Sequence, residues 1–137
     1  MFKSIIDVSS RDTDSLGHVN NTSLPLWFET SRNELYRIFN PSMELKPETW
    51  NLIMVHTEFD YLDQIYYGYE VEIRTYIEEI GNTSFTVYQE AWQKGKLRGT
   101  GRAILVDFNF NNQKKVPIPE DIRKELEKHL YRKQEVL

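Results

Sequence analysis

The most polar stretch of the chain, residues 11–21, carries side chains that could perform acid–base chemistry. It holds two carboxylates, one imidazole and two amides, which are Asp12, Asp14, His18, Asn20 and Asn21. A segment whose periodicity predicts a helix follows directly. The start of a helix presents backbone N–H groups without acceptors and the positive end of the helix dipole, which together can polarise a carbonyl and hold a developing oxyanion. A carboxylate beside such a start can act as a general base toward water or as a nucleophile.

Each of these residues also has a structural interpretation. A loop aspartate such as Asp14 can form an Asx turn, and Asp12 is expected to be structural and to pair with Arg11. His18 can serve as a hydrogen-bonding loop residue, although its titration range suits catalysis. The two asparagines can satisfy backbone groups at the helix start. Composition alone therefore makes this segment one plausible site among several.

The element that must position these residues is a helix predicted over residues 22–39. Apolar side chains recur there at spacings of three and four and so share one wide face, which carries Leu24, Trp27, Phe28, Leu35 and Ile38. The other face is polar, and Glu29 and Arg32 on it are expected to form a surface ion pair. A polar residue at 21–23 can cap the start, and Pro25 is tolerable in a first turn.

After a loop at residues 41–50 the pattern changes to period two, which predicts strands. The predicted strands cover residues 52–61, 69–78, 85–92 and 97–110, with a short one within 2–9 and a charged helix at 120–131. In the last long strand, Ile104, Val106, Phe108 and Phe110 are expected to share one face. One helix followed by an antiparallel strand meander is α+β, and a sheet curled around the helix covers its apolar face economically.

Length and composition bound the class of protein. With 137 residues, of which 39% are hydrophobic, the chain is expected to form one domain over 1–137. A net charge of −4 argues against nonspecific nucleic-acid binding. The absence of cysteine excludes disulfides and a thiolate nucleophile, and three separated histidines make a metal site an unattractive hypothesis. No apolar run suggests a signal peptide or a membrane span, so the expected location is the cytoplasm.

The loop sequence is recognisable as a motif. Asp-Thr-Asp-Ser-Leu-Gly-His-Val-Asn-Asn at residues 12–21, followed by Trp27-Phe28-Glu29, resembles the hotdog-fold acyl-CoA thioesterases related to 4-hydroxybenzoyl-CoA thioesterase. That family has Asp-x-x-Gly-x-Val before a helix with an aromatic pair and an acidic residue. Weaker signals at Phe59-x-Tyr61-Leu62 and Pro117-x-Pro119-Glu120 extend the resemblance over nearly the whole chain. It implies a hotdog fold, an antiparallel sheet wrapped around one long helix.

The resemblance also implies catalytic roles. The family's catalytic aspartate falls on Asp14, and the backbone N–H that polarises the thioester carbonyl falls on Asn21, where some relatives carry a histidine. His18 is a third candidate catalytic residue because it lies between them in the loop. The chain departs from the family at Leu24, where tyrosine is common, and at Pro25, and these departures could reshape the acyl pocket near the helix start.

Substrate-binding residues follow from the same resemblance. Gly17 and Asn20 occupy substrate-binding positions of the loop, and Thr57 and Glu58 correspond to residues that line the active site from the facing subunit. Basic residues that could meet the phosphates of coenzyme A, or could equally be solvated surface charges, are Arg98, Arg102, Lys114 and Lys115.

The implied activity is hydrolysis of an acyl-CoA thioester by a homodimer or homotetramer, with coenzyme A present only as part of the substrate and with no cofactor or metal. Three alternatives remain open on the same fold: an acyl-ACP thioesterase acting on acyl carrier protein, a non-catalytic acyl-binding subunit, and a dehydratase or hydratase. The last ranks lowest because the chain lacks the Asp/His pairing of those relatives.

Overall fold

The structure, a computed structural model, describes residues 1–44, 46 and 50–132. The described elements in chain order are β1 (Phe2–Ile6), the 3₁₀ helix η1 (Ser10–Asp12), α1 (Ser23–Ser31), α2 (Asn33–Phe39), β2 (Leu52–Tyr61), β3 (Val71–Ile80), β4 (Ser84–Gln93), β5 (Lys96–Asn109), β6 (Lys114–Lys115) and α3 (Glu120–Glu127). Part of the loop expected at 41–50 lies outside the described residues.

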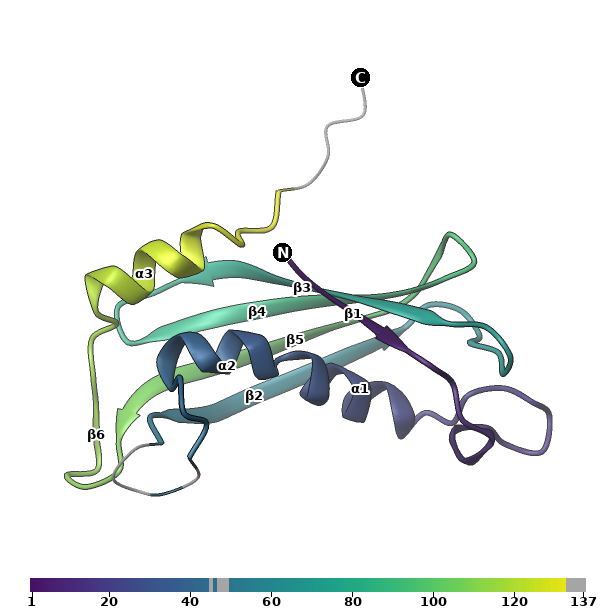
Figure 1. Cartoon of the computed structure of the whole chain (residues 1–137), viewed down its shortest axis with the longest axis horizontal. Coiled ribbons are helices and arrows are strands. Elements are labelled where there is room, and N and C mark those ends of the chain that lie inside the picture. The colour runs from purple at the N-terminus through teal and green to yellow at the C-terminus, as the bar shows by residue number, and fades with distance from the viewer. Residues whose placement is uncertain (45, 47–49, 133–137) are drawn as a thin grey trace.

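The strands form one antiparallel sheet in the order β1-β3-β4-β5-β2, and the short β6 pairs with the end of β5. The sheet curls around α1 and α2, which run along one of its faces, and α3 covers one end of that face (Figure 1). The predicted α+β class and hotdog fold are confirmed. In this order β2 is an edge strand, paired only with β5.

The predicted helix over 22–39 is two helices that meet at Arg32. In an uninterrupted helix the backbone N–H of Arg32 would donate to the carbonyl of Phe28, four residues earlier. That carbonyl instead accepts a 2.9 Å hydrogen bond from the side-chain amide of Gln89 on β4, and the Arg32 N–H donates to Glu29 O. A side chain inserted into the hydrogen-bond ladder is a recognised cause of a break, and here it comes from the sheet below.

The predicted surface ion pair between Glu29 and Arg32 is wrong. Arg32 is only 4% exposed. Its Nε donates to the Tyr36 hydroxyl at 2.8 Å and its Nη1 donates to Gln89 Oε1 at 3.2 Å. Because a buried guanidinium must have its N–H donors satisfied, Arg32 faces the sheet and fixes the joint between the two helices from the side opposite the solvent.

Replacing Gln89 by leucine is expected to lower the free energy of unfolding by about 2 kcal/mol, since it leaves Arg32 Nη1 buried without an acceptor. Urea unfolding followed by circular dichroism measures the loss. A double-mutant cycle with Arg32→Met is the control, because the double variant should lose less than the sum of the two single variants if the groups act as a pair. Strictly additive losses would show that they do not.

The apolar side chains that were expected to share one face of β5 lie on the face turned away from the helices. Ala103 and Leu105 belong to the buried core beneath the helices, so Ile104 and Val106 face the other way. The helix-facing positions nearer the start of β5 are glycines, where an added Cβ would lie 2.8 Å from the Leu24 side chain at Gly99 and 2.8 Å from the Phe28 ring at Gly101. Alternation alone did not show which face of β5 meets the helices, and glycines occupy these positions because α1 approaches too closely for side chains there.

The C-terminal helix ends at Glu127, earlier than predicted, because the chain then turns to bond with β3. Ile77 N donates to His129 O at 2.8 Å and Tyr131 N donates to Ile77 O at 2.7 Å. His129 stacks on Phe2 with ring centroids 4.0 Å apart, and burial is the main cause that lowers its pKa. The segment thereby ties the end of the described chain to its start.

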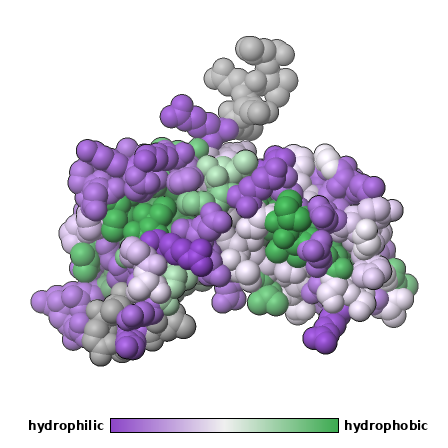
Figure 2. Space-filling model, viewed as in Figure 1, coloured by the Kyte–Doolittle hydropathy of each residue, from purple (hydrophilic) through white to green (hydrophobic). Residues whose placement is uncertain are grey.

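Within the described residues, no helix is long and apolar enough to cross a membrane. On the face that carries the helices, hydrophobic side chains reach the surface in two patches separated by hydrophilic ones (Figure 2). The buried core is likewise divided into one cluster around α2, α3 and the facing strands and a second around α1.

Candidate active site

The candidate loop, residues 12–21, closes on itself and then pairs with the segment before β3. Asp14 N donates to His18 O at 2.8 Å, and Val19 N donates to Ile65 O at 2.8 Å. Isolated β-bridges join Thr13 to Val19 and His18 to Tyr66. These backbone bonds hold the loop in a defined shape immediately before α1.

One oxygen of the Asp14 carboxylate shapes this loop. Oδ1 accepts from Leu16 N at 2.9 Å and from His18 N at 3.2 Å, which is the Asx-turn arrangement. No described residue donates to Oδ2, and Asp14 is exposed in the single chain. The structural interpretation of Asp14 therefore accounts for one of its oxygens and leaves the second open to an incoming group.

Gly17 and His18 complete the turn. Gly17 has φ +77°, a conformation that L side chains rarely adopt, and its N–H donates to Asp14 O at 3.1 Å. The His18 ring lies edge-on to the Tyr66 ring, with centroids 5.3 Å apart. His18 thus packs against the neighbouring segment while its backbone N–H orients the Asp14 carboxylate.

The start of α1 keeps a free donor. Asn20 accepts Thr22 N on its side chain at 3.3 Å and Ser23 N on its carbonyl at 3.0 Å. The backbone N–H of Asn21 has no acceptor among the described residues, and Thr22, at the N-cap, makes no side-chain capping bond. The N–H expected to polarise a carbonyl is therefore unoccupied.

Asp12 is structural, but not through the predicted pairing with Arg11. Its carboxylate accepts Ser9 N at 2.8 Å in the capping box of η1 and accepts the Ser23 hydroxyl at 3.2 Å. It therefore links η1 to the first residue of α1. The neighbouring carboxylates have different tasks: Asp12 is fully engaged in the scaffold, and Asp14 has one oxygen to spare.

A cavity of about 410 Å³ opens at the start of α1. Asn20 and Asn21 line one side of it and Leu24 lies deeper, while Tyr61 and Arg98 border it from the sheet. The Tyr61 hydroxyl donates to Asn21 O at 2.6 Å. Among the predicted site residues, Asn20 and Asn21 thus border this cavity, and Asp14, Gly17 and His18 form the turn that precedes them.

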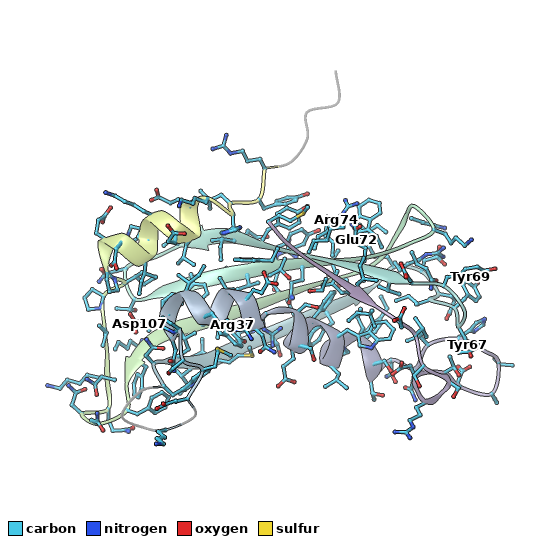
Figure 3. The ribbon with its side chains drawn as sticks, in the orientation of Figure 1. Arg37, Tyr67, Tyr69, Glu72, Arg74 and Asp107 are labelled. Atoms are coloured by element: carbon cyan, nitrogen blue, oxygen red, sulfur yellow. The ribbon has the colours of Figure 1, made fainter. Side chains whose placement is uncertain are left out.

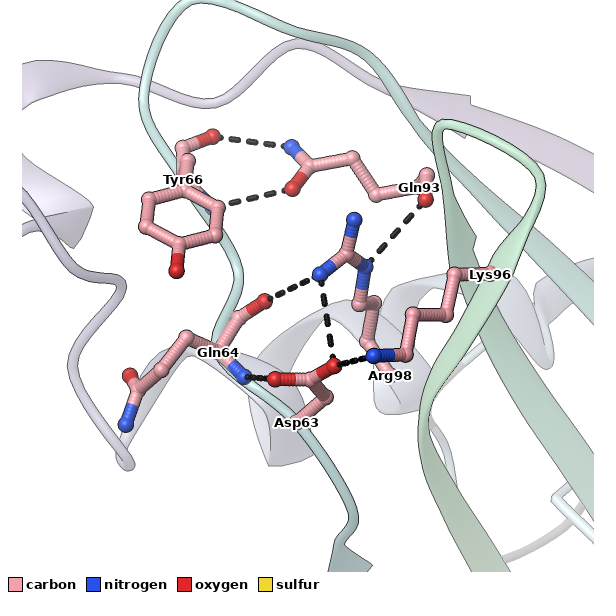
Figure 4. Close-up of polar contacts among 6 residues, drawn as sticks. All are labelled: Asp63, Gln64, Tyr66, Gln93, Lys96 and Arg98. Carbon is pink, nitrogen blue, oxygen red and sulfur yellow. Dashed lines mark hydrogen bonds and ion pairs between the residues drawn. The ribbon is translucent and has the colours of Figure 1, made fainter.

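A cluster of charges, which periodicity could not reveal, lies at the rim of this cavity (Figure 4). Asp63 pairs closely with Lys96 and lies 3.7 Å from Arg98 Nη1. The hydrogen bond from Lys96 is the main cause that lowers the pKa of Asp63. Arg98 also donates to the carbonyls of Gln64 and Gln93, so it braces the loop before β3 against the β4–β5 hairpin.

The other suggested phosphate contacts lie elsewhere. Arg102 makes a two-oxygen contact with Glu78, at 3.1 and 3.0 Å. Lys114 and Lys115 form β6, at the end of the molecule opposite the candidate loop (Figure 1). Only Arg98 of the suggested basic residues borders the cavity.

Thr57 and Glu58 do not join the loop in this chain. Both lie on the edge strand β2, where Glu58 Oε1 is 3.8 Å from His56 Nε2. Thr57 lines a separate, largely apolar groove of about 520 Å³ between the helices and β2, which also includes Pro25, Leu26, Met54 and Phe59. Their predicted contact with substrate would thus have to be made from another subunit or through this groove.

Comparison with known proteins bears on the fold and the family of the chain. The model of the thioesterase-like superfamily matches residues 8–126. A predicted thioesterase from Bacillus stearothermophilus is 40% identical, with 97% of this chain and 98% of that chain covered and a TM-score of 0.90. Among curated proteins, no match is found.

Two solved structures with bound coenzyme A are also similar. A thioesterase from Thermus thermophilus, complexed with coenzyme A and Zn, is 27% identical over 90% of this chain and 95% of that chain, with a TM-score of 0.77. A protein from Staphylococcus aureus in complex with CoA shares the fold at 16% identity, over 98% of this chain and 89% of that chain, with a TM-score of 0.84. The match to the family model covers most of the sequence, and the chain belongs to the thioesterase-like superfamily.

Proposed function

We propose that the protein is an acyl-CoA thioesterase that hydrolyses a thioester to a free acid and coenzyme A. The observation that carries the proposal is the loop that joins Asp14, with one carboxylate oxygen open, to Asn21, with a free backbone N–H at the start of a helix. An attacking base and an oxyanion donor on one rigid loop are the two parts that acyl transfer to water requires.

In the proposed reaction Asn21 N–H donates to the thioester oxygen and stabilises the charge that develops when the carbonyl is attacked. Asp14 acts by one of two routes. As a general base it takes a proton from water, which attacks the carbonyl; as a nucleophile it forms a mixed anhydride that water then cleaves. Both routes consume one water, break the carbon–sulfur bond and return the proton to the departing thiolate.

Two hollows suit the two halves of such a substrate. The cavity beside Asn21 has both polar and apolar lining, which fits the amide-containing pantetheine arm. The groove that includes Leu26, Met54 and Phe59 is largely apolar and fits an acyl chain. Thr57, predicted to contact substrate, lies in this groove.

A thiol-release assay over a panel of acyl-CoA and acyl carrier protein substrates tests the function. We expect turnover on at least one acyl-CoA. Faster turnover on the carrier-protein form of the same acyl group would instead support the acyl-ACP alternative. Saturable acyl-CoA binding without any thiol release would support the non-catalytic acyl-binding alternative and contradict the proposal.

The rim of the cavity is the proposed contact for the phosphates of coenzyme A, because Lys96 and Arg98 converge there. Lys96→Ala is expected to raise KM for acyl-CoA by roughly 3-fold to 5-fold with kcat unchanged, as the loss of one exposed charge contact would. The effect should disappear with an acyl-pantetheine substrate, which has no phosphates. Steady-state kinetics on the two substrates makes the comparison.

Lys94 provides the matched control. It lies in the same hairpin, but its ammonium sits over the Tyr69 ring, 4.0 Å from the centroid. Unlike Lys96, it forms no ion pair with Asp63, which lines the cavity. Lys94→Ala should leave KM near the unaltered value. Equal increases in KM for the two variants would indicate a general charge effect and would contradict phosphate binding at this rim.

We further propose that the active form is at least a homodimer built on β2. This edge strand is 10 residues long, and Ile53, Met54 and Val55 on it are exposed. A long edge with exposed apolar side chains is a surface that natural proteins cover. Pairing between two such edges would also bring Thr57 and Glu58 of one subunit toward the site of the other, as the family resemblance implies.

Val55→Lys is expected to shift the protein toward monomer at about 10 µM, roughly the concentration at which a weakened edge pairing dissociates. Turnover should fall as the dimer is lost. Sedimentation velocity measures the shift. Ile5→Lys is the control, because Ile5 is similarly exposed, at 51% against 58% for Val55, and lies on the opposite edge strand β1. A monomeric unaltered protein, or dissociation caused by the Ile5 variant alone, would contradict a dimer through β2.

A further inference from the structure

A second cavity, of about 320 Å³, lies at the end of the sheet away from the candidate active site. Asp107, near the end of β5, lines it. Figure 3 places Asp107 beside α2, at the end of the molecule opposite Tyr67. Tyr67 marks the candidate active site, because its backbone N–H donates a hydrogen bond to Gly17 O of the candidate loop. The thioesterase proposal makes no use of this cavity.

The Asp107 carboxylate is buried without a counter-charge. The residue is 5% exposed, and no described lysine, arginine or histidine forms an ion pair with it. Among the described groups, the backbone N–H of Phe108 is the one that favours the ionised form, and this N–H already donates to Asn51 O at 2.9 Å. A carboxylate with so little compensation is costly to bury, and burial raises the pKa of Asp107 to about 6.

A second acceptor beside it is also unsatisfied. The side-chain amide of Asn51 donates to Phe39 O at 2.8 Å, while Asn51 Oδ1 is buried with no hydrogen-bond partner among the described residues. Asn51 lines the same cavity as Asp107. A buried amide oxygen without a partner and a carboxylate with no side-chain donor among the described residues line the same cavity, which points to a ligand that brings N–H groups.

The rest of the lining is mixed and can contact both a cation and a short carbon chain. The lining includes three aromatic residues, Trp50, Phe108 and Phe110, and Ile122 on α3, together with two further amides, Asn109 and Asn111. Ring faces attract cations as well as covering methylene groups. The cavity offers a hard divalent ion one charged ligand, Asp107, and Asn109 Oδ1 in its lining already accepts from two backbone N–H groups. A primary ammonium instead has three N–H donors to share between Asp107 and Asn51.

We propose that this cavity is a binding site for a small aliphatic primary amine, whose ammonium group pairs with the Asp107 carboxylate and donates to Asn51 Oδ1. The aromatic rings enclose the carbon chain. The site is independent of thioester hydrolysis, so either assignment can fail without the other.

Calorimetric titration with n-butylammonium chloride at pH 7.5 tests the proposal, with n-butanol and tetramethylammonium chloride as probes that lack the charge or the N–H donors. We expect saturable 1:1 binding of n-butylammonium alone, weakened at least 10-fold by the isosteric change Asp107→Asn and kept in Asp14→Asn. A parallel titration with a lysine blocked at both backbone ends distinguishes a free amine from a protein side chain as the source of the ammonium.

A second measurement uses the unaltered protein and so does not depend on how the variant folds. Lowering the pH from 7.5 to 5 should protonate Asp107 and weaken n-butylammonium binding, with proton release on binding near pH 6. No saturable binding at pH 7.5, equal affinity in Asp107→Asn, or equal binding of tetramethylammonium would overturn the proposal.

Discussion

Asp14→Asn is expected to lower kcat for thioester hydrolysis by about 1,000-fold or more, which is within the range measured for the loss of an essential acid–base or nucleophilic group. Asparagine can neither take a proton from water nor form an anhydride. Its side-chain oxygen can still accept from Leu16 N and His18 N, as Asp14 Oδ1 does. The turn should therefore survive, and the thermal midpoint should change little. Thiol release and circular dichroism together separate chemistry from folding.

Asp12→Asn is the matched control for this prediction. Asp12 lies two residues away, but its oxygens serve Ser9 N and the Ser23 hydroxyl, so its loss should reduce stability more than turnover. Near wild-type turnover in Asp14→Asn would refute the catalytic assignment. In a single turnover of the unaltered protein in ¹⁸O-labelled water, label in the Asp14 carboxylate would identify the nucleophilic route, because only water attack on the aspartyl carbonyl of the anhydride places it there.

The site could be predicted from sequence where its geometry is local. Asp14, Gly17, His18 and Asn21 are near neighbours in the chain, and a turn followed by a helix start fixes their relation within a few residues. The rim of the cavity is different, because Asp63 and Lys96 come from a loop and a hairpin that only the folded sheet brings together. No periodicity connects those two residues, and no single-chain pattern places Thr57 against a partner.

The fold shows the same division. Strand positions and the curled sheet follow from alternation along each segment. The break at Arg32 does not, because its cause is Gln89, 57 residues further along the chain. The helix-facing side of β5 could not be assigned from the sequence, because Gly99 and Gly101, which face α1, have no side chain that a hydrophobic pattern could register.

Asp107→Asn is expected to stabilise the protein at neutral pH by about 3 kcal/mol, which makes it the largest predicted change in stability. The pKa of Asp107 rises from an ordinary value of 3.8 to about 6, and each unit corresponds to about 1.4 kcal/mol. Between the two pKa values the folded protein keeps the Asp107 proton while the unfolded chain loses it. The free energy of unfolding therefore falls as the pH rises from the unfolded-state pKa to the folded-state pKa, and it stays lower above both. The ionised side chain therefore penalises folding at pH 7.

Urea unfolding of both proteins between pH 3.5 and 8 (roughly the span that brackets the two pKa values) measures this. The gain in Asp107→Asn should be small near pH 4, appear between about pH 4 and 6, and stay constant above. A gain or loss that does not vary with pH would show that Asp107 is neutralised by another group.

The same experiment bears on the proposed amine site by linkage, because a bound ammonium that pairs with the ionised carboxylate must offset part of the penalty. Adding n-butylammonium at pH 7.5 should therefore raise the stability of the unaltered protein toward that of Asp107→Asn and leave the variant unchanged. A buried charge that costs stability in the free protein is retained where a ligand makes use of it.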